Sequence, residues 1–409
     1  MCFKRTDIWL PKKALDPGFM QKWGVIACDQ YTSDMSYWQN AKQFVGDEMS
    51  ALNLVFPEIY LEAESKKEQE KRMADIATFM AEYEKELVCH HDSMFYIERT
   101  LKNGAVRRGL LGAVDLDEYD FKKDSQTKIR PTEETVPGRL PPRVKIRENA
   151  LFELPHAMLL YDDQKDFLMA NIANSTENFT KLYDFELMCG SGKIKCYSLD
   201  DKTMDQIEKT LPTFEKDGIA LAMGDGNHSL AAAKQCWENL KKTLPKESHA
   251  NHPARYALAE IVNIYDRSLE FEPIYRLLFD AMPDDVIEKL KAISNTAPLG
   301  ANKCEYEIYC GGEYNAVTIE SEHGLPVKAL QLFLDEYTAK YGGRLDYVHG
   351  KAETIELAKN AGAIGFVFET MKKSELFSAV AKEGALPRKT FSMGEARDKR
   401  FYIECRKIK

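Results

Sequence analysis

Residues 218–242 contain, in direct succession, a short apolar run, a glycine-containing turn and an alanine-rich amphipathic segment. The run GIALAM (218–223) has the length and composition of a buried strand. A helix is expected from about His228 to Lys242. The turn residues are, in order, Gly224, Asp225, Gly226, Asn227, His228 and Ser229. A strand that passes so directly into a helix indicates mixed α and β structure.

This turn has the features of a phosphate site. Gly224 and Gly226 permit positive φ and a close approach to the backbone. The first turn of a helix offers N–H groups without intrahelical partners and the positive end of the macrodipole. His228 can donate to a phosphoryl oxygen, and Asp225 can hold Mg²⁺ or accept a hydroxyl proton. Alternatively, Asp225 or Asn227 caps the helix and the glycines only turn the chain. The Walker and dinucleotide-binding motifs are both absent.

The remaining pattern predicts an α+β protein of two lobes with mixed sheets. At 409 residues the chain exceeds what one core usually supports. Hairpins are expected at Lys102-Asn103-Gly104 and at Gly311-Gly312, each between apolar runs. Helices are expected at 33–45, 65–88, 204–214, 326–340, 352–361 and 372–383, and strands at 23–28, 157–161, 256–265, 344–348, 363–368 and 400–406. We expect an N-terminal lobe with the phosphate site (1–270) and a C-terminal α/β lobe (271–409).

Residues 122–147 are polar, rich in proline and arginine, and without periodicity. Such a stretch is either a linker or a functional loop, and its four arginines (130, 139, 143 and 147) favour the loop. Glu133 and Glu134 lie within it. If the loop folds over the phosphate turn, one of them can act as the general base. The alternative is a solvated acidic pair at a helix start near Thr132.

Composition excludes several classes of partner. A net charge of −9 gives no electrostatic footprint for nucleic acid or for an acidic membrane. No run of 18 apolar residues is present, so no membrane-spanning helix is expected. Nine cysteines without a C-x-x-C pair fit a reduced protein, and we expect a cytoplasmic one. A homo-oligomer is possible.

The turn resembles the signature of domain-of-unknown-function family 1015, whose usual form is Asp-Gly-His-His-Arg. Other segments follow in the family's order: Pro57-Glu58-Ile59-Tyr60, Arg130–Thr135, the strand with Asn263 and Asp266, Pro273-Ile274-Tyr275-Arg276, and Leu386-Pro387-Arg388-Lys389-Thr390. The resemblance covers nearly the whole chain. The Asp-Gly-x-His core is also similar to that of free serine kinases and of the ParB/sulfiredoxin-like fold.

The resemblance implies phosphoryl transfer from ATP or ADP, with Mg²⁺, to a small hydroxylated metabolite such as free serine. Asp225 would bind the metal or orient the acceptor, His228 would stabilise the transferring group, and Glu133 or Glu134 would take the proton. The expected binding residues are Gly224, Gly226, Asn227, Ser229, Arg130, Thr132, Arg139, Asn263 and Arg276. Two alternatives are a nucleotide- or phosphometabolite-binding regulatory protein without turnover, and a hydrolase of a phosphoester such as phosphoserine.

This chain departs from the family pattern at two positions of the turn. Asn227 replaces the first histidine, and Ser229 replaces the arginine. The arginine would clamp a phosphate through two hydrogen bonds, so the missing charge must come from elsewhere. Arg130, Arg139 and Arg276 are the candidates.

Several other residues have a functional and a structural interpretation. Asp29 is a rival base or metal ligand, and Asn263 and Asp266 end a buried strand as binding groups or turn formers. The C-terminal segment LPRKTFSMGEARDKRF could bring basic side chains to a cleft, although a solvated loop is more usual. His249 and His252 lack further ligands at metal-binding spacing. Cys28 lacks an evident histidine base, which disfavours thiol catalysis.

Overall fold

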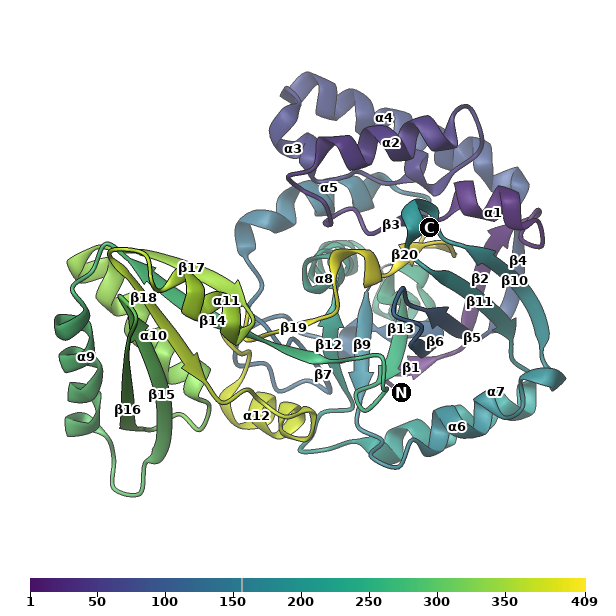
Figure 1. Ribbon diagram of the computed structural model, residues 1–409. Helices are drawn as coiled ribbons and strands as arrows, with labels where there is room; N and C mark the ends of the chain where they lie inside the picture. Colours follow the sequence, from purple (N-terminus) through teal and green to yellow (C-terminus); the bar gives the residue numbers. More distant parts are fainter. Residues whose placement is uncertain (156) are drawn as a thin grey trace. The chain divides into compact units, whose positions relative to one another are not determined.

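The computed structural model describes residues 1–155 and 157–409 and shows a mixed α/β protein with several sheets (Figure 1). Its contacts divide the chain into two units. Unit 1 contains Met1–Pro131, Thr135–Leu269 and Glu395–Lys409, and unit 2 contains Thr132–Glu134 and Glu270–Gly394. The expected division at 270/271 differs from these units mainly in two short segments. Thr132–Glu134 belongs to unit 2 although it precedes the expected division, and Glu395–Lys409 belongs to unit 1 although it follows it.

Unit 1 is built on a nine-stranded sheet. Its strands are, in spatial order, β10 (Thr180–Glu186), β11 (Lys193–Ser198), β5 (Phe95–Thr100), β6 (Val106–Asp115), β13 (Tyr256–Asn263), β9 (Met158–Tyr161), β12 (Leu221–Asp225) and β7 (Ile129–Arg130), with β1 (Phe3–Lys4) paired to β6. The pairs β13–β9 and β12–β7 are parallel, and the others are antiparallel. The hairpin predicted at Asn103-Gly104 is confirmed as β5–β6.

Helices cover both faces of this sheet. Successive residues of a strand point to opposite faces, so a single strand contributes side chains to both cores. On β5, Phe95 and Ile97 pack with α1 (Pro17–Trp23), α2 (Met35–Val45) and α4 (Lys66–Tyr83). Tyr96, between them, packs on the other face with α6 (Phe167–Ala173), α7 (Asp201–Thr210) and α8 (Asn227–Lys241). Unit 1 therefore has three layers and two hydrophobic cores. The predicted strand–turn–helix at 218–242 is confirmed as β12 and α8.

Unit 2 contains a six-stranded antiparallel sheet. Its strands are, in spatial order, β16 (Glu313–Ser321), β15 (Asn302–Cys310), β18 (Ala363–Phe368), β14 (Phe271–Phe279) and β17 (Arg344–His349), with β19 (Phe391–Met393) paired to β14. Its helices are α9 (Pro283–Ala292), α10 (Pro326–Tyr341), α11 (Lys351–Leu357) and α12 (Leu376–Glu383). The hairpin predicted at Gly311-Gly312 is confirmed. The lobe combines helices and strands as expected, but its sheet is antiparallel in every pair rather than mixed.

Three predictions from local pattern are wrong. The helix expected at 65–88 ends at Tyr83, and β4 (Leu87–Ser93) follows and pairs with β2 (Thr6–Pro11). The stretch 122–147 is not all loop, because α5 (Leu140–Asn149) begins there with prolines in its first turn, where their missing N–H groups do no harm. The strand expected at 400–406 is two short strands.

These two strands join segments far apart in the sequence. β20 (Phe401–Tyr402) pairs with β3 (Val25–Ile26), and β21 (Arg406–Lys407) pairs with β8 (Phe152–Glu153). Both pairs lie in unit 1. The C-terminal segment is therefore part of the same unit as the glycine turn.

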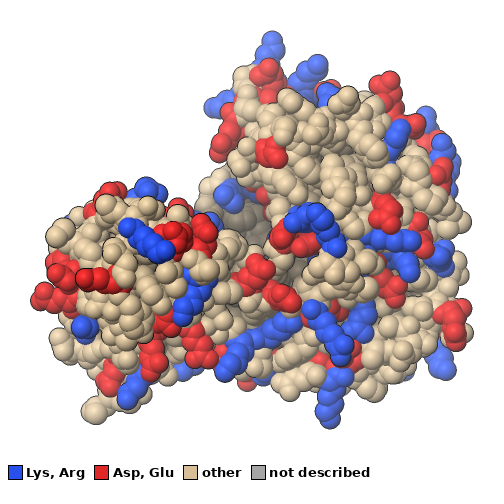
Figure 2. Space-filling view, in the orientation of Figure 1, with Lys and Arg blue, Asp and Glu red and all other residues tan. Residues whose placement is uncertain are grey.

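No helix in the described residues is long and apolar enough to cross a membrane. Figure 2 shows acidic and basic side chains interspersed over the visible face. Two further short elements contact the surroundings of α8: α3 (Ile59–Ala63) lines the pocket described below through Leu61, and the 3₁₀ turn Leu116–Glu118 accepts a hydrogen bond from Lys234.

Candidate functional site

The glycine turn lies where β12 ends and α8 begins. Gly226 is the N-cap of α8 with φ 81°, and no side chain caps the helix. The Asp225 carboxylate instead accepts a hydrogen bond from the Gly226 N–H at 2.9 Å. The interpretation of this turn as a side-chain-capped helix start is therefore wrong for the described residues.

Packing against the segment that leads into β9 explains both glycines. A Cβ on Gly226 would lie 2.8 Å from the Cα of Ala157, and one on Gly224 would lie 3.1 Å from the Met158 carbonyl oxygen. Positive φ at Gly226 adds a second reason for glycine. We expected the glycines to leave room for a ligand. The space beside them is filled by the protein itself.

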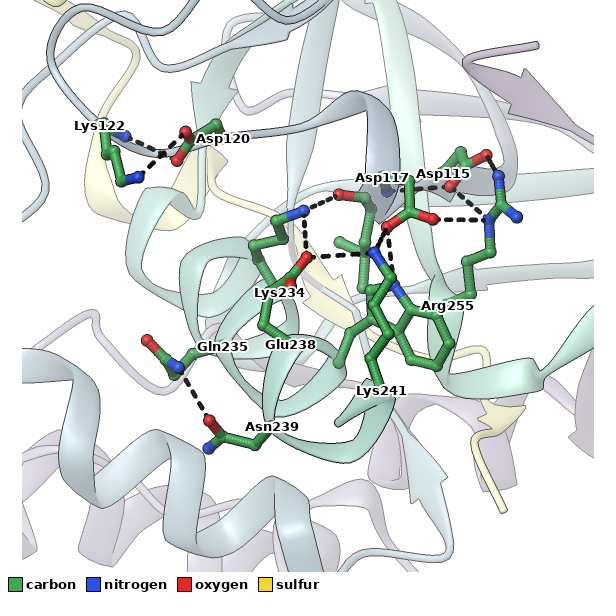
Figure 3. A network of polar contacts seen from close by, with 12 residues as sticks. Asp115, Asp117, Asp120, Lys122, Lys234, Gln235, Glu238, Asn239, Lys241 and Arg255 are labelled. Atoms are coloured by element: carbon green, nitrogen blue, oxygen red, sulfur yellow. Dashed lines mark hydrogen bonds and ion pairs between the residues drawn. The ribbon is translucent and has the colours of Figure 1, made fainter. Parts of the chain in front are cut away.

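Helix α8 is anchored by a polar network on its outer side (Figure 3). Lys241 donates to the Asp117 carboxylate at 2.5 Å, and the Trp237 indole N–H donates to the same carboxylate at 2.9 Å. Lys234 donates to the Leu116 carbonyl at 2.8 Å. Arg255 completes the network through a two-bond contact with Asp115 at 2.9 and 2.7 Å. The second half of α8 is therefore fixed by side-chain contacts to the segment 115–117.

A lysine from the C-terminal segment lies beside the turn. The Lys399 ammonium is 3.6 Å from the Asp225 carboxylate, and each side chain is 18 % exposed. Lys399 brings to the turn a positive charge of the kind that we sought among three arginines. The charge of the segment 386–401 was noted from sequence, but no local signal linked Lys399 to a turn 174 positions earlier.

Two buried arginines hold the backbone that carries Lys399. Arg99 donates to the carbonyl oxygens of Arg397 (2.9 Å) and Lys399 (3.3 Å), and Arg107 donates to that of Asp398 (2.8 Å). Burial, helped by the neighbouring Arg107 charge, lowers the pKa of Arg99 to about 9. Buried guanidinium groups require such acceptors, so the backbone carbonyls of this segment are held in place.

His228 and Asn227 occupy the first turn of α8. The His228 Nε2 accepts a hydrogen bond from the Val136 N–H at 3.2 Å. In the neutral ring the proton is therefore on Nδ1, and a donor role belongs to that atom. Within the described part of the chain, the buried Asn227 Oδ1 has no hydrogen-bond partner. A buried polar atom without a partner is costly to the fold.

A pocket of about 140 Å³ opens beside Ser229 of α8. Its wall is mostly apolar and comes from α4, α5, α8 and the segments near residues 28, 54–61 and 152. Ligand sites for larger molecules usually have about 300 Å³ or more. The pocket therefore suits a small metabolite rather than a whole nucleotide.

Opposite charges pair along this pocket. Glu58 forms an ion pair with Arg143, and Glu153 forms ion pairs with Arg147 and Arg406, each at 2.6 Å. Burial by itself would raise the pKa of Glu153, but the charges of Arg147 and Arg406 lower it overall. The arginine-rich stretch thus reaches the site through α5.

Cys28 also lines the pocket. Burial raises the pKa of its thiol to about 11, with a further contribution from Asp29. The Tyr402 hydroxyl donates to the sulfur at 3.0 Å. A thiol with so high a pKa is a poor nucleophile at neutral pH, in agreement with the sequence.

The expected arginines lie elsewhere. The Arg130 Nε donates to the Thr127 carbonyl at 2.8 Å, and its guanidinium lies beside Gly218, which precedes the start of β12. Arg139 is exposed, and its carbonyl accepts from Arg143 at 2.5 Å. Parallel pairing of β7 with β12 brings the Arg130 backbone near, but its side chain points away from the turn.

Arg276, the third candidate, is a buried residue of unit 2. It donates to Gln331 (2.7 Å) and to the carbonyls of Ile274 (2.7 Å) and Lys389 (3.0 Å). Burial lowers its pKa to about 10. These contacts join β14 to the segment before β19, which is a structural role.

The remaining predicted residues are divided between the units. In unit 2, the Thr132 carbonyl accepts from the Leu386 N–H at 2.8 Å, and Glu133, next to Glu134, forms a β-bridge with Leu386. In unit 1, Asn263 is fully buried and bonds the Asp163 backbone, at the opposite end of β9 from Asp225.

His249 and His252 serve the fold. The His249 Nε2 lies 3.2 Å from the Leu244 carbonyl, the His252 Nδ1 accepts from the Ala254 N–H, and both rings contact Trp237. Asp29 accepts from Gln30 at 3.1 Å. Asp266 forms an ion pair with Arg108.

Comparison with known structures finds distant similarity. Free serine kinase in complex with AMP is 14% identical, with 72% of this chain and 91% of that chain covered and a TM-score of 0.38. A conserved hypothetical protein from Pyrococcus furiosus is 14% identical (73% and 94% covered, TM-score 0.34). SbnI with a C-terminal truncation, from Staphylococcus aureus, is 11% identical (72% and 82% covered, TM-score 0.34).

No curated protein matches this chain in sequence. A family match is found, and it covers residues 9–337, more than half of the chain. That region includes the second half of β2, all of the pocket-lining residues except Tyr402, the glycine turn and the first part of unit 2. The chain therefore belongs to the family described as "Protein of unknown function (DUF1015)".

Proposed function

We propose that this protein is a small-molecule phosphotransferase, which moves a phosphoryl group from ATP or ADP to the hydroxyl of a metabolite such as free serine. Its phosphate site would be the ParB/sulfiredoxin-like element formed by β12, the turn and α8. The observation that carries the proposal is the grouping of the α8 N-terminus, the Lys399 ammonium and the unpartnered Asn227 Oδ1 next to a small pocket. A helix N-terminus with an added cation favours a phosphate.

Each residue of the turn has a distinct proposed task. The N–H groups of the first turn of α8 bind phosphate oxygens, and Lys399 neutralises the charge that develops during transfer. His228 donates from Nδ1, or from Nε2 once Val136 releases it. Ser229 donates one hydrogen bond at the mouth of the pocket.

The Asp225 carboxylate is suited to be the protein ligand of a magnesium ion that is held mainly by nucleotide phosphates and water. Mg²⁺ in such sites needs only one or two protein carboxylates. When bound, the ion supplies charge neutralisation at the phosphates. Asp225 would exchange its contact with Lys399 for this ion, which frees the lysine for a phosphate oxygen.

The transfer itself is a displacement at phosphorus. The acceptor oxygen forms a bond to the terminal phosphorus, the bond from that phosphorus to the bridging oxygen breaks, and the nucleotide leaves with the electron pair. The hydroxyl proton passes to a carboxylate. Glu133 and Glu134 are the candidates from sequence, and Glu58 is the candidate that lines the pocket.

The pocket provides the chemistry to hold an amino acid. Glu58 and Arg143 offer a negative and a positive group side by side, and a zwitterion presents the opposite pair. If Glu133 or Glu134 is the base, an ammonium on Glu58 and a carboxylate on Arg143 would place a short side chain toward Ser229. This match favours a small amino acid with a hydroxyl group as acceptor.

Phosphorus NMR of the full chain with Mg²⁺, free serine, and ATP or ADP tests the proposal. We expect a new phosphomonoester resonance together with the corresponding nucleotide product. His228→Ala and Lys399→Met should each slow transfer about 10²-fold, the usual effect of removing one preorganised group. Lys242→Met, at the exposed far end of α8, is the matched control and should leave the rate unchanged.

The base is identified by comparison of Glu58→Gln, Glu133→Gln and Glu134→Gln in the same assay. The variant that lacks the true base should have a lower kcat with little change in KM. If no nucleotide yields a phosphorylated product, the kinase assignment is rejected.

A nucleotide-binding regulatory role is the second candidate, and one observation favours it. Asp225 and His228, the two proposed catalytic side chains, are both already engaged, by Lys399 and by the Val136 N–H. This role predicts saturable nucleotide binding that Lys399→Met weakens, without any product. Release of inorganic phosphate from phosphoserine without nucleotide would instead indicate a hydrolase.

A further inference from the structure

A second cluster of chemically active side chains lies on the β2–β4 strand pair of unit 1. Asp7 comes from β2, and Cys89 and His91 come from β4. One ligand atom from each residue lies within 4.8 Å of the other two. In the described residues this is the only such group of three. The phosphotransfer proposed above does not involve these three residues.

The local strand geometry brings these residues together. Cys89 and His91 are two positions apart on one strand, so their side chains share a face. The register shifts between Thr6 and Ile8, so that Asp7 lies opposite two residues of β4, His91 and Asp92, in a β-bulge of that strand. The core-facing neighbour Ile8 is fully buried, so the ligand face is the outer one.

The spacing of the side chains suits a metal ion. The Cys89 Sγ is 3.4 Å from the His91 Nδ1, and that nitrogen is 3.1 Å from the Asp7 Oδ2. Tetrahedral zinc with bonds of about 2.0–2.3 Å places its ligand atoms about 3.4–3.6 Å apart. These two distances come close to the zinc values, and the Cys89 and Asp7 ligand atoms lie within 4.8 Å of each other, so side-chain rotation would admit the ion.

The carboxylate is held in place by a further contact. Its other oxygen, Asp7 Oδ1, accepts a hydrogen bond from the Asp92 N–H at 3.0 Å. Asp92 has φ 43°, an uncommon conformation that turns its N–H toward the carboxylate. Support of this kind orients the ligands of metal sites. The Oδ2 atom is left facing His91.

We propose that Asp7, Cys89 and His91 bind a zinc-class divalent transition metal, with solvent in the fourth position. Sulfur, imidazole nitrogen and one carboxylate oxygen form a donor set typical of zinc. Magnesium and calcium prefer oxygen ligands alone and are not expected here.

Cobalt(II) added to the full-length reduced protein tests this site, because a cobalt–thiolate bond gives a strong near-ultraviolet charge-transfer band. We expect the band to saturate at one equivalent and to disappear when zinc displaces the cobalt. Cys89→Ser should abolish the band, and His91→Ala and Asp7→Asn should weaken binding at least tenfold. Cys189→Ser, an exposed thiol elsewhere, and His90→Ala, the adjacent histidine, are matched controls and should bind as wild type.

Two results would overturn the proposal. One is the absence of saturable cobalt binding to the wild-type protein. The other is a band that survives in Cys89→Ser, which would assign the thiolate to another cysteine. Since all three ligand side chains are partly or fully solvent-accessible, the variants should fold, and an unchanged thermal midpoint verifies this.

Discussion

Gly226→Ala separates the two reasons for glycine in the turn. Gly226 has φ 81°, and a Cβ there would lie 2.8 Å from the Ala157 Cα. Gly104, in the β5–β6 hairpin, has a similar φ of 85° but nothing within 4 Å of its added Cβ. The pair therefore shares the backbone strain and differs in the steric contact.

The expected losses follow from these two terms. A non-glycine residue with left-handed φ costs about 1–2 kcal/mol, which is the whole effect expected for Gly104→Ala. The contact with the Ala157 backbone adds about 1–3 kcal/mol, the usual range for forcing an extra carbon into filled space. Gly226→Ala should thus lower the free energy of unfolding by about 2–5 kcal/mol.

Denaturant unfolding followed by tryptophan fluorescence measures both variants. The four tryptophans, at positions 9, 23, 38 and 237, all lie in unit 1, so the signal reports on the unit that contains both glycines. Equal losses for the two variants would refute the close-contact reasoning. The space beside Gly226 would then be open, and a ligand would again be the better explanation of the glycine.

Three further outcomes are expected. Glu153 has a depressed pKa because Arg147 and Arg406 outweigh its burial, so its stabilisation is present above about pH 4.5 and is lost as the pH falls. Glu153→Gln should therefore flatten the pH dependence of the unfolding midpoint below that value. Lys399→Met should weaken nucleotide binding at least tenfold, as measured by calorimetry. Ser229→Arg in the Lys399→Met protein should restore part of that affinity, and no recovery would place the lysine's effect elsewhere.

Local signals in the sequence predicted the elements well. Both Gly-containing hairpins, the strand–turn–helix at 218–242 and the N-terminal start of α4 are present. Each of these depends on neighbours within a few residues: a turn that needs glycine, or the capping box of Ser65 and Glu68. Such signals survive because tertiary contacts reinforce them.

Tertiary contacts also account for the errors. Helix α5 has few apolar residues, and only Leu140 of them is fully buried, so no periodicity was visible. Its arginines are neutralised by Glu58 and Glu153, which lie on other segments. The end of α4 was missed because β4 exists only through its pairing with β2. The residues of β4 alone contain no signal that identifies a partner strand about 80 residues earlier in the sequence.

The charge at the turn shows how this limit affects functional inference. The arginine expected from the family resemblance is local in the sequence and would be found by a motif search, whereas in the proposed site Ser229 and Lys399 would divide the same task between two segments. Such a division requires that the backbone carrying the lysine is held in place. Arg99 and Arg107 hold it through hydrogen bonds to the carbonyl oxygens of residues 397–399. Because two buried arginines hold that backbone, the lysine is preorganised rather than a mobile surface charge. A departure from the motif at one residue is therefore not by itself evidence for loss of phosphate binding.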